Sequence, residues 1–83
     1  MARGVPVVVN DVGKEIGEFV RARRKAGKFT QRELGELAGV GTRLVSELER
    51  GKGTARLDSV QKVLAVFGKA IGVVDAPRED DAP

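Results

Sequence analysis

The chain has 83 residues, enough for one small domain, and contains neither Cys nor His, which excludes disulfides, thiolate metal sites and the commonest general base. Its 15 Lys and Arg exceed its 12 Asp and Glu, and the basic excess lies in residues 1–56, whereas residues 57–83 are net acidic. A basic first part predicts a polyanionic partner, with a solubilising surface as the alternative.

The small size limits what the chain can do alone. A domain of this length buries only about 60% of the surface of its unfolded chain, so we expect self-association to supply stability. We expect no enzyme activity and no cofactor, because the chain is too short to enclose a substrate pocket. No apolar run approaches the roughly 20 residues that cross a bilayer, and the amino terminus lacks a secretory signal, which predicts a cytoplasmic protein without a membrane partner.

Residues 1–10 are predicted to form a leader, in which Val5 to Val9 is a β-branched run interrupted by Pro6. Such a run favours a short strand. Because Pro6 cannot donate a backbone hydrogen bond, the strand lies at a sheet edge or begins after it. A disordered leader is the alternative.

A first helix is expected next, capped by Asn10 or Asp11 and running to about Lys25, at the start of a domain over residues 11–68. Apolar residues recur along it at helical spacing, namely Val12, Ile16, Phe19 and Val20. Its last turn is rich in cations that complement the negative end of the helix dipole, namely Arg21, Arg23, Arg24 and Lys25.

The central stretch, Thr30 to Gly51, has the outline of two short helices joined by a sharp turn. Thr30 and Glu33 are spaced for a capping box, and Gly39 supplies the backbone freedom that the turn needs. The second helix is expected to end at Arg50, with Gly51 in a left-handed conformation. The residues predicted to face the core are Leu34, Leu37, Ala38, Val40, Leu44, Val45 and Leu48.

A loop over residues 52–56 leads to a last helix, for which Asp58 is the expected cap. Its apolar face consists of Val60, Val63, Leu64 and Phe67, and Gly68 ends it. Residues 69–76 are predicted to form a dimerisation segment, with a short strand over Ala70, Ile71, Gly72, Val73 and Val74. Residues 77–83, acidic and bracketed by prolines, are predicted to be disordered.

The second helix of the central pair keeps a polar outer face once its apolar residues point inward. An Arg with hydroxyl neighbours near an exposed helix N-terminus suits a DNA major groove, where Arg can bond O6 and N7 of guanine. The side chains expected to read bases are Thr42, Arg43, Ser46 and Glu47, and those expected to contact phosphates are Gln31, Arg32, Arg50 and Lys52. A solvated helix face is the alternative for Arg32, and Glu47 is expected either to accept from N4 of cytosine or to repel wrong sites.

Several short sequences of this region occur together in one known family: Thr30-Gln31, Glu33-Leu34, Leu37-Ala38-Gly39-Val40 and Ser46 to Lys52. From about Ile16 to Gly68 the chain resembles the Xre family, the helix-turn-helix of the lambda repressor and Cro type. The resemblance implies an all-α, compact bundle of four or five helices and an ion pair between Arg24 and Glu49, which gives Arg24 a structural role. The family often has Ser or Thr where this chain has Gly41, so either Gly41 or Thr42 caps the second helix.

A narrower likeness lies in Val40 to Arg43, Arg50 to Lys52 and Thr54 to Asp58, followed by a helix and a short strand. These segments resemble antitoxins of the HipB type, which repress their own operon and neutralise a HipA-type kinase toxin. The resemblance implies that the strand over residues 70–74 pairs with its twin across a two-fold axis, in an intersubunit sheet to which Val5 to Val9 could add outer strands. An isolated short strand cannot satisfy its own backbone groups, which agrees with this pairing.

Together these patterns predict a homodimeric, sequence-specific repressor that binds a palindromic operator in double-stranded DNA. It would also be the antitoxin of a type II toxin-antitoxin pair with a HipA-like kinase toxin. One alternative is a stand-alone phage-type or metabolic repressor without a toxin partner. The other is a protein-interaction scaffold without DNA specificity.

Overall fold

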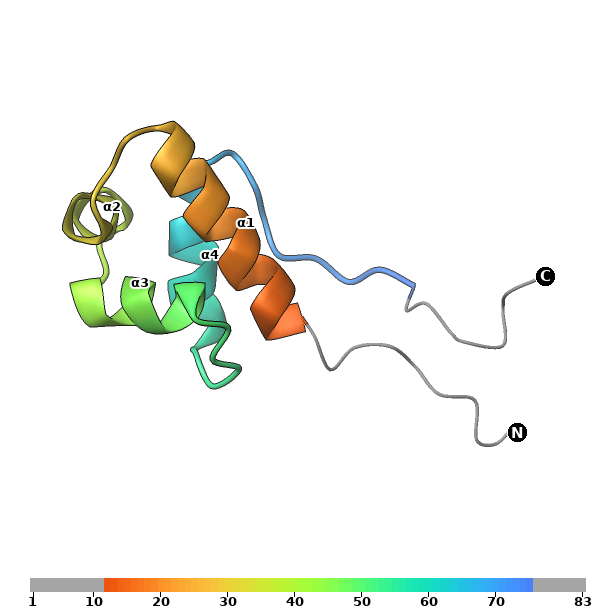
Figure 1. Ribbon diagram of the computed structural model, residues 1–83. Helices are drawn as coiled ribbons and strands as arrows, with labels where there is room; N and C mark the ends of the chain where they lie inside the picture. The colour runs from red at the N-terminus through yellow and green to blue at the C-terminus, as the bar shows by residue number, and fades with distance from the viewer. Residues whose placement is uncertain (1–11, 76–83) are drawn as a thin grey trace, which may run out of the picture.

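The computed structural model describes residues 12–75. Over this range the fold is all-α (Figure 1), and its four helices are α1 (Val12–Ala26), α2 (Gln31–Ala38), α3 (Thr42–Glu49) and α4 (Leu57–Val66). The predicted all-α class and the order of the helices are therefore confirmed. The predictions for the leader, for a cap at Asn10 or Asp11 and for the acidic tail lie outside the described residues. None of the helices in residues 12–75 is long and apolar enough to cross a membrane.

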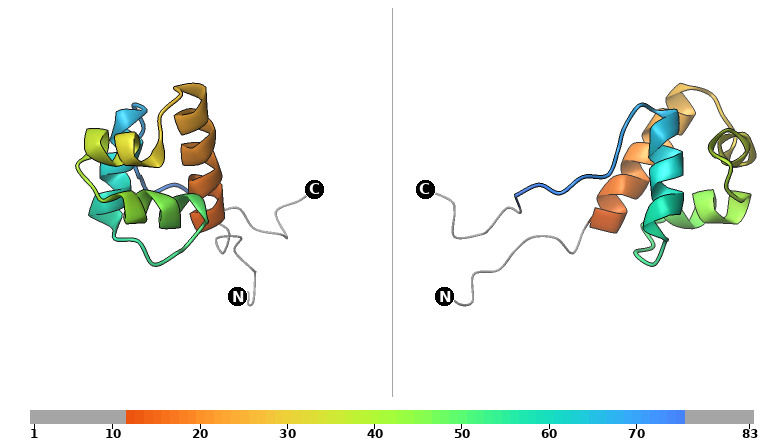
Figure 2. Two further views of the ribbon diagram at one scale, coloured as in Figure 1. Left: turned by 60° about the vertical axis from the view of Figure 1, so that its left-hand side comes forward. Right: turned by 180° about the vertical axis from the view of Figure 1, so that it is seen from behind.

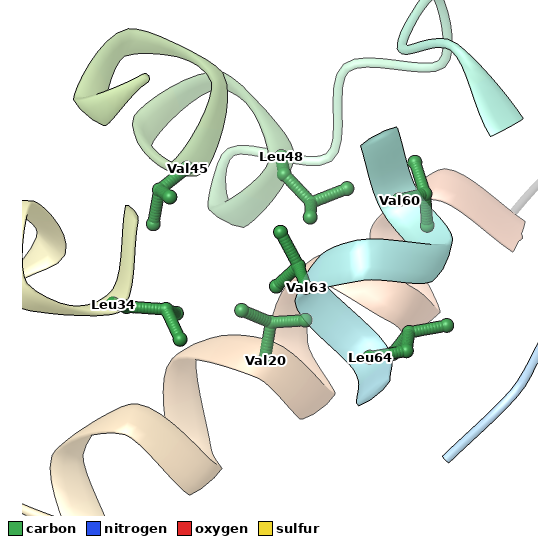
Figure 3. Packing of buried hydrophobic residues seen from close by; sticks show 7 residues of the cluster. All are labelled: Val20, Leu34, Val45, Leu48, Val60, Val63 and Leu64. Atoms are coloured by element: carbon green, nitrogen blue, oxygen red, sulfur yellow. The ribbon is translucent and has the colours of Figure 1, made fainter. Parts of the chain in front are cut away.

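One hydrophobic core joins the four helices, and each of them contributes at least one buried side chain to it (Figure 3). These side chains are Val20, Leu34, Val45, Leu48, Val60, Val63 and Leu64. Beside the core, the rings of Phe19 and Phe67 meet edge to face with their centroids 6.2 Å apart, which ties α1 to the end of α4. The apolar faces predicted for α1 and α4 thus meet inside the molecule, except that Val12 at the start of α1 is 55% exposed.

Leu37 is an exception to the predicted core, because its side chain is 57% exposed. The inward positions of α2 are taken by Leu34, which is fully buried, and by the half-buried Ala38. Leu37 instead lines a shallow surface groove together with Phe29. Only one face of a surface helix packs against the core, and Leu37 lies outside that face of α2.

The helix-turn-helix has the local geometry that its sequence predicts. The Thr30 hydroxyl accepts from the Glu33 amide at 3.0 Å and the Glu33 carboxylate accepts from the Thr30 amide at 2.8 Å, which completes the capping box. Gly39 and Gly51 have φ angles of 75° and 81°, in the left-handed region that favours glycine. The N-cap of α3 is Gly41, so Thr42 is the first helical residue.

The predicted cap of α4 is wrong by two positions, because the N-cap is Arg56 and not Asp58. Asp58 lies inside the first turn, where its carboxylate accepts from the Arg56 guanidinium and from the Ser59 amide. A negative charge in the first turn is favourable next to the positive end of the helix dipole. An acidic residue near a helix start therefore signals the helix without fixing its first residue.

The predicted strand over Ala70–Val74 is absent from the described chain, and the structure shows a coil there that leaves the four helices (Figure 2). A strand requires a neighbouring backbone to pair with, and no segment within residues 12–75 supplies one. The start of the coil is instead held by Gln61 of α4. The Gln61 oxygen accepts from the Ile71 amide at 2.7 Å, and its nitrogen donates to the Lys69 carbonyl at 3.3 Å.

Candidate nucleic-acid interface

The helix α3 lies at one edge of the molecule, and its lower side in Figures 1 and 2 faces no other helix. Val45 and Leu48 are buried and fix the opposite side of α3 in the core. The four side chains predicted to read bases remain accessible, since Thr42 and Arg43 are exposed and Ser46 and Glu47 are half-buried. The structure therefore gathers Thr42, Arg43, Ser46 and Glu47 on one outward face of one helix.

Two glycines let neighbouring backbone come close enough to hold α3 in place. A Cβ atom at Gly17 of α1 would lie far inside van der Waals distance of the Leu48 carbonyl oxygen. A Cβ atom at Gly35 of α2 would lie 2.8 Å from the carbonyl oxygen of Val40 in the turn. The backbone of α1 thus touches α3, and the backbone of α2 touches the turn before α3. Neither contact leaves room for a side chain at the glycine.

An ion pair across the domain also fixes the C-terminal end of α3. The Arg24 guanidinium donates to both carboxylate oxygens of Glu49, at 2.6 and 3.0 Å, and also to the Phe29 carbonyl at 2.8 Å. The Glu49 side chain is only 1% exposed and that of Arg24 is 13% exposed. The pair implied by the family resemblance is thus present, and it links α1, the loop before α2 and the last turn of α3.

The buried carboxyl of Glu49 remains ionised. Burial alone would raise the pKa of Glu49, but hydrogen bonds from Arg24 and Gln31 and the positive charge of Arg24 hold that pKa below its ordinary value. The hydrogen bond from Glu49 in turn raises the pKa of Arg24. Every buried polar side-chain atom within residues 12–75 has a hydrogen-bond partner, so this network carries no unsatisfied group.

The residues predicted to contact phosphates lie in two places. Arg32 is on the first turn of α2, and Arg50 and Lys52 follow the end of α3; all three are exposed. Gln31 differs, because it is half-buried and its side-chain nitrogen donates to Glu49 at 3.2 Å. This hydrogen bond joins the N-terminus of α2 to the last turn of α3. The first turn of α2 and the residues that follow α3 therefore lie beside the same end of the outward face of α3.

Three charged side chains form a cluster on the outward face of α3, namely Arg43, Glu47 and Lys52. Sequence spacing alone did not reveal this cluster. The Glu47 carboxylate oxygen Oε2 lies 3.2 Å from Nε of Arg43 and 3.4 Å from Nζ of Lys52. The hydrogen bond from Arg43, together with the charges of Lys52 and Arg43, lowers the pKa of Glu47. One carboxylate therefore joins a predicted base-reading Arg to a predicted phosphate-contacting Lys.

Known proteins are similar to this chain in sequence and fold. Residues 20–74 match the helix-turn-helix family. The chain is 43% identical over 65 residues to an uncharacterised HTH-type transcriptional regulator of Sinorhizobium fredii, across 78% of this chain and 84% of that protein. It is 30% identical over 59 residues to another such regulator, of Haemophilus influenzae, across 71% of this chain and 59% of that protein.

Among solved structures, the chain is similar to one described as a toxin-antitoxin module from Streptococcus pneumoniae. The two share 38% sequence identity with a TM-score of 0.63, and the match covers 78% of this chain and 71% of that chain. The family match spans α2, the turn and α3, which carry the outward polar face described above. The chain therefore belongs to the Xre-type helix-turn-helix family, whose members are DNA-binding transcriptional regulators and not enzymes.

Proposed function

We propose that the protein is a homodimeric, sequence-specific repressor that reads its operator with the outer face of α3. The observation that carries the proposal is the exposure of Thr42 and Arg43 beside the half-buried Ser46 and Glu47, while Val45 and Leu48 hold the helix in the core. A rigidly supported helix with such a face fits the major groove of DNA. Arg43 would bond O6 and N7 of a guanine, and Arg32, Arg50 and Lys52 would contact phosphates.

Replacing Arg43 by Ala tests this reading directly. A base contact of this kind contributes about 1–3 kcal/mol of discrimination, so the variant should lose its preference at one base step and keep it elsewhere. Competition binding with operator variants measures that preference. An equal loss of affinity on every sequence would show that Arg43 contacts only phosphate.

The coil that follows α4 supports a second part of the proposal, which is that the chain dimerises through residues 70–74. Its apolar side chains are largely in solvent, with Val73 fully exposed and Val74 82% exposed. Pairing with the same segment of a second copy would satisfy the backbone and cover these side chains. Sedimentation of a chain lacking residues 69–83 tests this pairing, and a dimer that persists after the deletion would contradict it.

We further propose that the protein is the antitoxin of a type II toxin-antitoxin pair and that its toxin is a HipA-like kinase. The support is the similarity at 38% identity to a protein from a toxin-antitoxin module, together with the sequence likeness to HipB-type antitoxins. If this is correct, the product of a neighbouring gene should stop growth when expressed alone. Growth should return when this chain is expressed with it.

A stand-alone repressor is the second candidate, because both curated relatives are named as transcriptional regulators without reference to a toxin. The same growth experiment separates the two. A neighbouring gene whose product is harmless alone, with regulation of the upstream promoter intact, would favour the stand-alone repressor.

A further inference from the structure

Glu47 was expected to face DNA bases, yet its surroundings fit a different task. Its carboxylate oxygen Oε2 lies between two cations, with Nε of Arg43 at 3.2 Å and Nζ of Lys52 at 3.4 Å. The Glu47 side chain is 25% exposed, whereas that of Arg43 is 89% exposed. A base edge that approached α3 would meet Arg43 first and would have to compete with both cations for the Glu47 carboxylate.

The contact with Glu47 uses only one of the donor nitrogens of Arg43. Within residues 12–75, Arg43 donates through Nε to Glu47, and its terminal nitrogens Nη1 and Nη2 have no hydrogen-bond partner. A guanine presents two acceptors, O6 and N7, which an Arg meets best with two parallel N–H groups. An Arg held through Nε therefore keeps its terminal nitrogens as donors for a guanine. The contact with Glu47 also restricts the rotamers of Arg43 before DNA binds, which reduces the entropy cost of binding.

We propose that Glu47 is a positioning residue, which holds Arg43 in a base-reading orientation and does not read a base itself. The inference rests on the proposed DNA-binding function and concerns the same face of α3. The two cations also compensate the negative charge of Glu47, so that it can lie near DNA phosphates without net repulsion. The hydrogen bond from Arg43 and the charges of Lys52 and Arg43 lower the pKa of Glu47 and so favour its ionised form.

A second Arg–Glu pair in the same chain provides a matched control. Arg32 and Glu36 are also four residues apart on a helix, with Nε and Oε2 separated by 3.5 Å. Their side chains are 80% and 69% exposed, and α2 is not the helix proposed to read bases. Pairs of this spacing are common on helix surfaces and contribute little, so Glu36→Ala measures what losing such a pair does in general.

The test is a comparison of base preferences. Wild type, Arg43→Ala, Glu47→Ala, the double variant and Glu36→Ala are each used to select from a randomised duplex library, and circular dichroism checks that each is folded. Arg43→Ala should lose about 5- to 150-fold of discrimination at one base step. Glu47→Ala should lose most of the discrimination at that same step, and the double variant should be no worse than Arg43→Ala.

Two further variants complete the expected pattern. Glu36→Ala should select the wild-type sequence with unchanged preference at every position. Glu47→Gln retains an oxygen that can accept from Nε of Arg43, so it should keep more of the discrimination than Glu47→Ala does.

Two results would overturn the inference while leaving the proposed function intact. If Glu47→Ala loses preference at a different base step from Arg43→Ala, Glu47 reads a base itself. If Glu47→Ala keeps every preference and changes the affinity for all sequences equally, it acts only as a charge. If wild type itself selects no sequence, both the proposed function and the inference fail, and that outcome is distinguishable from the first two.

Discussion

Replacing Arg24 by Met removes the charge that faces the most buried carboxylate of the described domain and keeps most of the aliphatic stem. Glu49 would then retain only the hydrogen bond from Gln31, with its side chain 1% exposed. Breaking a buried ion pair by removing one partner costs about 3–5 kcal/mol, because a charge is left uncompensated.

The uncompensated carboxyl can escape by taking up a proton. Since its ordinary pKa is 4.5, protonating Glu49 at pH 7 costs about 3.4 kcal/mol. The destabilisation from the unpaired charge therefore cannot exceed that value, and the loss of the hydrogen bonds from Arg24 adds to it. We therefore expect Arg24→Met to lower the free energy of unfolding by about 3 kcal/mol at pH 7. In a domain of this size, that loss lowers Tm by about 12–24 °C.

The same reasoning fixes the sign of the pH dependence. In the wild type the pKa of Glu49 is depressed, so its contribution to stability is present above pH 4.5 and is lost only as pH falls through the lower folded value. In Arg24→Met we expect burial to raise the pKa of Glu49. The free-energy cost of protonating Glu49 then becomes small as the pH falls. The difference in stability between the two proteins should therefore shrink to about 1 kcal/mol near pH 4.5.

Urea unfolding followed by circular dichroism at pH 7 and pH 4.5 measures this difference. The matched control is Arg32→Met, which breaks an exposed pair and should cost less than about 0.5 kcal/mol at either pH. If Arg24→Met is as mild as Arg32→Met, or if its penalty does not change with pH, Glu49 is not the buried, paired carboxylate described here.

Gly17→Ala should lower the free energy of unfolding by about 1–3 kcal/mol, measured by urea unfolding, because its Cβ would meet the Leu48 carbonyl oxygen. The control is Gly53→Ala, which should change stability little because the space around Gly53 is open. Equal effects of the two substitutions would contradict the close approach of α1 and α3. Lys52→Ala should reduce the slope of log affinity against log salt by about one unit in fluorescence anisotropy; an unchanged slope would exclude a phosphate contact. Gln61→Ala releases the start of the coil after α4 and should weaken the proposed dimer in sedimentation, whereas an unchanged dissociation constant would show that Gln61 does not position that coil.

Local signals in the sequence were sufficient for the helices and the turn. The capping box at Thr30 and Glu33 and the left-handed glycines at Gly39 and Gly51 depend on residues only a few positions apart. Such features are fixed by backbone geometry near the residue itself, so a sequence pattern can predict them. The outward position of Thr42, Arg43, Ser46 and Glu47, which are proposed to read bases, could be predicted for the same reason, because burial of Val45 and Leu48 determines which side of α3 faces outward.

The features that the sequence missed depend on packing and chain turns that the spacing of residues along a helix does not describe. Gln61 reaches across to Lys69 and Ile71, and nothing in its spacing marks it as a backbone partner. Leu37 fits the apolar pattern of α2, but its side chain is 57% exposed because Leu34 and Ala38 take the inward positions of that helix. The contact of Lys52 with Glu47 depends on how the chain turns after α3, which spacing along a helix does not describe.

Footprinting on the DNA upstream of the protein's own gene tests the central claim most directly, which is that paired copies of the α3 face read a specific operator. The proposal predicts protection of an inverted repeat whose half-sites lie about one helical turn, roughly 34 Å, apart. Protection should vanish with Arg43→Ala at a protein concentration that protects the site with wild type. A single half-site, or protection that unrelated competitor DNA removes as readily as the repeat does, would contradict the account.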